Sequence, residues 1–155
     1  KMAEINILGH KKWKRKRYNR LEQNVRKVYP YALTLSNLLG QYDFLIDSLE
    51  AYSGFNRYLK KRKIFSKIEK DLITRYGNSI TKLTRTQGRI LVRLVDRETS
   101  RTSFDIIKNF RNVFSAGFWQ ITAKLFGHNL KSAYDPTSGE DKQIEYIIKN
   151  KILTR

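Results

Sequence analysis

The residues best suited to chemistry in this chain are clustered cations. Residues 10–20 read HKKWKRKRYNR, so Lys and Arg hold seven of these eleven positions, with one Trp and one Tyr among them. Lys and Arg bind phosphate and carboxylate groups, and aromatic rings can stack on bases. The candidate partner-binding residues in this run are Lys11, Lys12, Trp13, Lys14, Arg15, Lys16 and Arg17.

Three partners are open for this basic run. Lys and Arg could bind the backbone of a nucleic acid while Trp13 and Tyr18 stack on its bases. The same residues could lie on anionic lipid or glycan at a membrane surface. No amphipathic helix with a large apolar face surrounds the run, however. The third partner is an acidic protein surface, and composition alone does not choose among the three.

Two further clusters are candidate anion-binding sites. One is an arginine ladder with a step of four residues, in which guanidinium groups could bind phosphates with two hydrogen bonds each. The alternative is a solvated helix face whose counter-charges come from Asp96, Glu98 and neighbouring helices, which is the more common case. The residues of the two clusters are Lys60, Lys61, Arg62 and Lys63, and Arg85, Arg89, Arg93 and Arg97.

Catalysis has little support in the sequence. The chain has no Cys and only two His, which excludes disulfides, thiolate metal sites, cysteine nucleophiles and a multi-histidine metal site. No glycine-rich phosphate loop, Gly-x-Ser-x-Gly or HExxH motif occurs. We therefore expect a protein that is not an enzyme and uses no cofactor, with a hydrolase built around His128 as the weakest alternative.

The size and charge of the chain further limit its possible domain organisation and partners. A chain of 155 residues is long enough for one domain with a real core. Its 32 basic and 14 acidic residues give a net charge of +18, so we expect a partner with negative charge. No apolar run approaches the roughly 18 residues that span a bilayer, so we expect no transmembrane segment.

Apolar periodicity predicts an all-α fold, a single compact bundle of five or six helices. Apolar residues recur at steps of three and four from Leu21 to Leu39, which places them on one helical stripe. Pro30 lies inside this stripe and predicts a kink or a break. Further helices are predicted at 42–52, 58–76 with an end at Gly77 and Asn78, 80–94, 104–125 and 144–152.

The N-terminus carries a different pattern. Residues 4–9, EINILG, place Ile5 and Ile7 on one side of a short period-two pattern, which predicts a strand. No second strand is predicted, so this strand would pair with the sheet edge of a partner. We therefore divide the chain into an extended, strand-like segment and basic neck at 1–17 and a helical domain at 18–155.

Several sequence blocks suggest a family. They are VRKVYPYA at 25–32, LTRTQGRILVRLVDRETSRTSFDII at 83–107, FWQ at 118–120 and LFGHNLKSAYDPTSGEDKQIEYI at 125–147. Together they resemble a family of short exported Bacteroidetes proteins that carries only a domain-of-unknown-function label. The resemblance covers most of residues 18–148 and implies a location in the periplasm, at the inner face of the outer membrane. Because Lys1 precedes Met2, we expect that a signal peptide has been removed upstream.

These inferences predict a non-enzymatic accessory or binding subunit of a cell-envelope protein complex. It would dock through the N-terminal strand and the basic surface. The alternative is a nucleic-acid-binding module that uses the same basic surface, which export of the protein would disfavour.

Overall fold

The computed structural model of the protein describes residues 2–99, 116 and 133–154. Its elements in chain order are α1 (Met2–Ser48), a 3-10 turn (Leu49–Ala51), α2 (Gly54–Thr81), α3 (Arg85–Thr99), α6 (Gly139–Ile147) and a π-helical turn (Ile148–Ile152). Every regular element within these ranges is helical, which confirms the all-α class. The described ranges hold four α-helices, and the helix predicted at 104–125 lies outside them.

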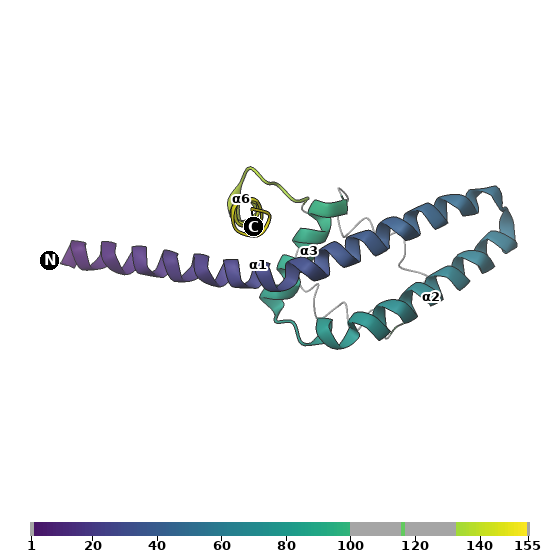
Figure 1. Ribbon diagram of the computed structural model, residues 1–155, viewed down its shortest axis with the longest axis horizontal. Helices are drawn as coiled ribbons and strands as arrows, with labels where there is room; N and C mark the ends of the chain where they lie inside the picture. Colours follow the sequence, from purple (N-terminus) through teal and green to yellow (C-terminus); the bar gives the residue numbers. More distant parts are fainter. Residues whose placement is uncertain (1, 100–115, 117–132, 155) are drawn as a thin grey trace.

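The long helix α1 organises the molecule. Its N-terminal half projects beyond the other elements, and its C-terminal half leads to the point where the chain turns back into α2 (Figure 1). Pro30 lies inside the helix without ending it. Proline lacks the amide that would bond to the preceding turn, and the helix changes direction where it passes α3 (Figure 1). The Thr34 hydroxyl donates to the Pro30 carbonyl at 2.9 Å, a contact that often accompanies bent helices.

The predicted strand at 4–9 is wrong, because these residues belong to α1. Helix α1 also crosses the predicted division at 17/18 without a break. Two isoleucines two positions apart are too short a pattern to define a strand. Once a helix is nucleated downstream, each added residue gains a backbone bond, whereas a lone strand has no partner for its backbone.

The core lies where α1, α3 and α6 meet. The predicted stripe of α1 supplies Leu21, Val25, Val28 and Ala32, all of them buried. The other buried residues of this cluster are Tyr29 from α1, Ile90, Leu91, Leu94 and Val95 from α3, and Ile144, Ile147 and Ile148 from the C-terminal segment. The stripe prediction is therefore confirmed, and it fixes α3 and α6 against the middle of α1.

Several predicted helix ends are wrong. The stripe that ends at Leu39 and the helix predicted at 42–52 are not separate, because α1 runs through Gly40 to Ser48, and α2 continues through Gly77 and Asn78 to Thr81. Glycine in a helix costs only about 1 kcal/mol, so a favourable helix on both sides passes through it. The chain reverses instead near Gly54, whose φ of +62° suits a residue without a side chain.

Candidate functional site

The first candidate site is the run of cations on the projecting half of α1, residues 11–20, which we call the basic arm. Every Lys and Arg of the arm is exposed, and Trp13 retains 56% of its accessible surface. The Arg17 guanidinium lies 5.6 Å from the centre of the Trp13 ring. The sequence has no carboxylate between Glu4 and Glu22, so the arm forms a continuous positive surface.

An open groove of about 520 Å³ lies where the basic arm meets the body, the packed part of α1, α3 and α6, and we call it the arm groove. Helix α1 contributes Trp13, Lys16, Arg17, Arg20, Leu21 and Asn24, α3 contributes Thr86 and Arg89, and α6 contributes Glu140 and Gln143. Positions 13, 17, 20 and 24 follow steps of four and three, so their side chains share one face of α1. The groove therefore combines an aromatic face, four cations, one carboxylate and several neutral polar groups.

The wall formed by α3 is held by a capping box at its start. The Thr84 hydroxyl accepts a hydrogen bond from the backbone N–H of Gln87 at 3.2 Å. The side-chain carbonyl of Gln87 accepts one from the backbone N–H of Thr84 at 3.2 Å. The Gln87 side-chain NH₂ then donates to Asn24 Oδ1 at 3.1 Å. These bonds tie the first turn of α3 to α1, which places Thr86 and Arg89 beside the arm.

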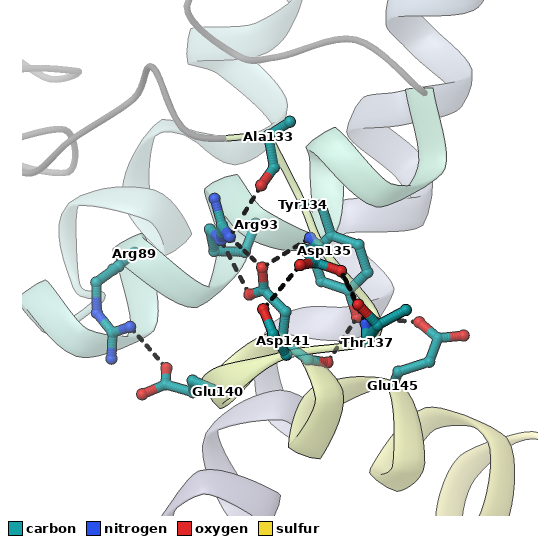
Figure 2. Close-up of polar contacts among 10 residues, drawn as sticks. Arg89, Arg93, Ala133, Tyr134, Asp135, Thr137, Glu140, Asp141 and Glu145 are labelled. Atoms are coloured by element: carbon teal, nitrogen blue, oxygen red, sulfur yellow. Dashed lines mark hydrogen bonds and ion pairs between the residues drawn. The ribbon is translucent and has the colours of Figure 1, made fainter.

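The wall formed by α6 is held by a cluster of ion pairs with the arginine ladder, the α3–α6 ion-pair cluster (Figure 2). Arg89 Nη1 lies 2.6 Å from Glu140 Oε1, and Arg93 contacts both carboxylate oxygens of Asp141. Arg97 Nε lies 2.7 Å from Glu145 Oε2. All three carboxylates of α6 are thus paired with guanidinium groups of α3.

Hydrogen bonds around this cluster hold its charges in place. The hydrogen bonds from Arg97 lower the pKa of Glu145 to about 2, although burial of the carboxylate opposes them. Burial raises the pKa of Tyr134, and the bond that its hydroxyl donates to Glu145 at 2.9 Å raises it further. Fixed charges of this kind suit a structural joint between α3 and α6 better than proton transfer.

A turn before α6 completes the cluster. The hydroxyls of Thr137 and Ser138 donate to the Asp135 carboxylate at 2.6 and 2.7 Å, and they lower its pKa to about 2. The Asp135 amide donates to Asp141 Oδ2 at 3.0 Å (Figure 2). The turn therefore anchors the start of α6, the end that contributes to the arm groove.

The structure distributes the predicted site residues over several surfaces. Trp13, Lys16 and Arg17 line the arm groove, whereas Lys11, Lys12, Lys14 and Arg15 are exposed outside its lining. The cluster Lys60, Lys61, Arg62 and Lys63 lies on α2, where Lys60 Nζ is 3.4 Å from the centre of the Tyr52 ring. Ile5 and Ile7 lie near the start of α1.

The arginine ladder divides in the same way. Arg89, Arg93 and Arg97 have carboxylate partners on α6, which matches the alternative of counter-charges from a neighbouring helix. Arg85 is exposed and has no ion pair within the described ranges. Binding of an external anion by the ladder stays a prediction, and the internal pairs leave fewer guanidinium donors for it.

Sequence reasoning missed the polar groups that complete the arm groove. Asn24 could have been found, because it continues the spacing of Trp13, Arg17 and Arg20 on one helical face. Thr86 and Gln143 could not, since they approach the arm only through the packing of α3 and α6. His128, the centre of the hydrolase alternative, lies outside the described residues.

The described ranges hold neither a metal-binding cluster nor a membrane-spanning helix. Among these residues, no group of three or more His, Cys, Asp or Glu side chains could hold a metal ion. None of the helices within these ranges combines the length and apolar character needed to cross a membrane.

Comparison with known proteins shows a family for this chain. A family model described as "Domain of unknown function (DUF4294)" matches residues 1–150. No curated protein and no solved structure matches the chain. The match supports the domain-of-unknown-function part of the resemblance, while the lineage and the export of the chain stay predictions.

Proposed function

The chain belongs to the DUF4294 family, and we propose that it is a non-enzymatic accessory or binding subunit of a cell-envelope protein complex. The body formed by α1, α3 and α6 holds the basic arm, and the arm docks on an acidic surface of the partner. The complex lies in the periplasm, associated with the inner face of the outer membrane. This location rests on the resemblance described above.

The observation that carries the proposal is the exposed basic arm on an uninterrupted helix. Its cations include Lys11 and Arg15, Lys12 and Lys16, and Lys16 and Arg20, which are like-charged pairs four residues apart. Each such pair destabilises a helix by a few tenths of a kcal/mol, roughly 0.2–0.5. A partner with negative charge would relieve this repulsion, so the arm gains stability when it binds.

The arm would dock on its partner as a helix rather than as a strand. The arm presents Lys11, Lys12, Lys14 and Arg15 away from the groove lining, and we call these four residues the outer face. Acidic side chains on a partner helix or loop could pair with the outer face along its length. Such complementarity chiefly sets specificity and the association rate.

The test is a charge-matched comparison in pull-downs from the source cell envelope. One variant replaces each outer-face residue by Gln, and the control replaces Lys60, Lys61, Arg62 and Lys63 by Gln, which removes the same charge from α2. We expect the outer-face variant to lose an envelope protein that the wild type and the control both retain. The retained protein is then purified, and its direct binding to both variants is measured. Equal recovery by the two variants would overturn docking through the arm.

A second candidate, a nucleic-acid-binding module, is favoured by one observation. Trp13 is exposed among cations, an arrangement that suits stacking on a base beside bound phosphates. Anisotropy titrations with single-stranded and duplex DNA would test it. This candidate requires an affinity that falls steeply with salt, a clear loss in Trp13→Ala, and a cytoplasmic location of the full-length protein. Export of the protein would count against it.

A further inference from the structure

The arm groove carries charge at one end and neutral polar groups at the other. Lys16, Arg17 and Arg20 lie on the arm side, and none of them has an ion pair with a carboxylate in the part of the chain that the structure describes. On the body side, Arg89 and Glu140 neutralise each other at 2.6 Å. The unpaired positive charge is therefore concentrated on the arm side of the groove.

The arm side matches a phosphate group. Arg17 and Arg20 are three residues apart on one helix, so both guanidinium groups can reach the same anion. Guanidinium groups bind phosphate oxygens with paired, charge-assisted hydrogen bonds. Lys16, one turn before Arg20, adds a third donor. One phosphate fits this concentration of cations.

Trp13 adds a flat aromatic face next to this charge. Trp13 is 56% exposed and borders the groove, with the Arg17 guanidinium 5.6 Å from the centre of its ring. An indole ring offers a large apolar surface whose conformation is nearly fixed. The apolar face of a ring in the ligand, rather than a flexible chain, would cover such a surface.

The body side matches hydroxyl groups. Asn24, Thr86 and Gln143 supply neutral donors and acceptors, and Asn24 Oδ1 is already used by Gln87. One carboxylate oxygen of Glu140 pairs with Arg89, and the carboxylate has further acceptor capacity for a hydroxyl. A second phosphate would meet this carboxylate, so repeated phosphates fit the groove poorly.

We propose that the arm groove binds a phosphorylated oligosaccharide, with the phosphate on Lys16, Arg17 and Arg20, a sugar ring on Trp13, and sugar hydroxyls on the body side. From Trp13 to Asn24 helix α1 rises about 16 Å, a length that accommodates more than one sugar ring. A single-stranded nucleic acid is disfavoured because it carries a phosphate on every residue. This site is separate from the outer face and goes beyond the docking role.

The direct test is isothermal titration calorimetry of the full chain with trehalose 6-phosphate. Trehalose, inorganic phosphate and a single-stranded oligothymidylate serve as comparison ligands. We expect trehalose 6-phosphate to bind at least roughly tenfold more tightly than trehalose or phosphate, as expected for one charge-assisted interaction combined with ring contact. Equal affinity for inorganic phosphate, tighter binding of the oligothymidylate, or no binding of the sugar phosphate would each overturn the proposal.

Variants locate the site. Trp13→Ala and Arg20→Gln should each weaken trehalose 6-phosphate binding by roughly tenfold or more. Arg85→Gln, which removes an exposed guanidinium outside the groove lining, should change it less than twofold, about 0.4 kcal/mol. The outer-face Gln variant should also retain binding. An equal loss in the outer-face variant would mean that diffuse charge attracts the ligand, and would overturn the site. Helical content by circular dichroism shows that each variant is folded.

A vesicle assay distinguishes a lipid-linked source of the sugar phosphate from a free one. Phosphatidylcholine vesicles that contain monophosphoryl lipid A, a phosphorylated disaccharide on acyl chains, are compared with vesicles that contain phosphatidylglycerol. If the protein pellets with the lipid A vesicles but not with the phosphatidylglycerol vesicles, the result supports the proposal with a lipid-linked ligand. Binding of trehalose 6-phosphate without pelleting supports it with a free ligand. Equal pelleting with both vesicles, together with equal affinity for trehalose 6-phosphate and inorganic phosphate, would overturn it, because charge alone would explain the binding.

Discussion

Replacement of Arg93 by Ala removes the most enclosed cation of the α3–α6 ion-pair cluster. The side chains of Arg93 and Asp141 retain only 18% and 7% of their accessible surface. Arg93 bonds to both carboxylate oxygens of Asp141 and to the Ala133 carbonyl at 3.2 Å. After the substitution, Asp141 keeps the Asp135 amide at 3.0 Å as a donor, but it loses its counter-charge.

The expected loss follows from the burial of this pair. Removal of one partner from a buried ion pair costs about 3–5 kcal/mol, because the other charge stays buried without compensation. Arg93 is partly exposed and Asp141 keeps one donor, so the loss in free energy of unfolding should lie near the lower end, about 3 kcal/mol. Arg85 is the matched control on the same helix. Arg85→Ala should cost no more than about 0.5 kcal/mol, as for an ordinary surface position.

The assay is urea unfolding followed by circular dichroism, with the free energy of unfolding extrapolated to water. A double-mutant cycle with Arg93→Ala and Asp141→Ala then isolates the coupling between the two residues. We expect a coupling energy of about 1–3 kcal/mol, in the range measured for residues in contact. Equal losses in Arg93→Ala and Arg85→Ala, or a coupling energy close to zero, would refute the view that this pair joins α3 to α6.

Other substitutions in the same body also have measurable effects on stability. Glu145 has a pKa lowered to about 2 from an ordinary 4.5, so its contribution to stability is present above pH 4.5 and is lost as pH falls toward 2. Glu145→Gln should therefore flatten the pH dependence of the urea midpoint in that window; an unchanged slope would contradict the assignment. Thr84→Ala removes one half of the capping box with Gln87 and should cost about 1 kcal/mol in free energy of unfolding, whereas Thr84→Ser should restore most of it. Ile90→Ala, at a fully buried position, should cost about 2–5 kcal/mol and lower the melting temperature in calorimetry; a loss below 1 kcal/mol would place Ile90 outside the core.

The core could be predicted from the sequence because its signal is local and physical. The stripe that begins at Leu21 repeats over several turns, and every residue of a stripe must be covered for the helix to be stable in water. The segment at 4–9 offered only two alternating isoleucines, and the prediction from them was wrong. Helix ends predicted at single glycines were also wrong, since a glycine costs a helix only about 1 kcal/mol, which is small beside the packing energy of a long helix.

The candidate site was only partly predictable for a different reason. Clustered cations are visible in the sequence, so the basic arm was found. The partners of the arginine ladder lie 48–51 residues away on α6, and no local pattern encodes such a pairing. The same holds for the arm groove, which exists only because α3 and α6 place polar side chains beside Trp13 and Arg20.

The uneven use of carboxylates is the reason why we propose the arm as the functional end of the described structure. All three acids of α6 are paired with α3, and Glu22 is paired with Arg26 next to the arm. The arm keeps its charge, but salt limits the reach of that charge to about 8 Å at physiological ionic strength. An arm of ten residues spans about 15 Å, so a partner must lie along it to meet all its cations. A continuous helix presents them in fixed positions, which lowers the entropic cost of binding. An extended, flexible neck with the same sequence would have to be ordered first, and would bind more weakly.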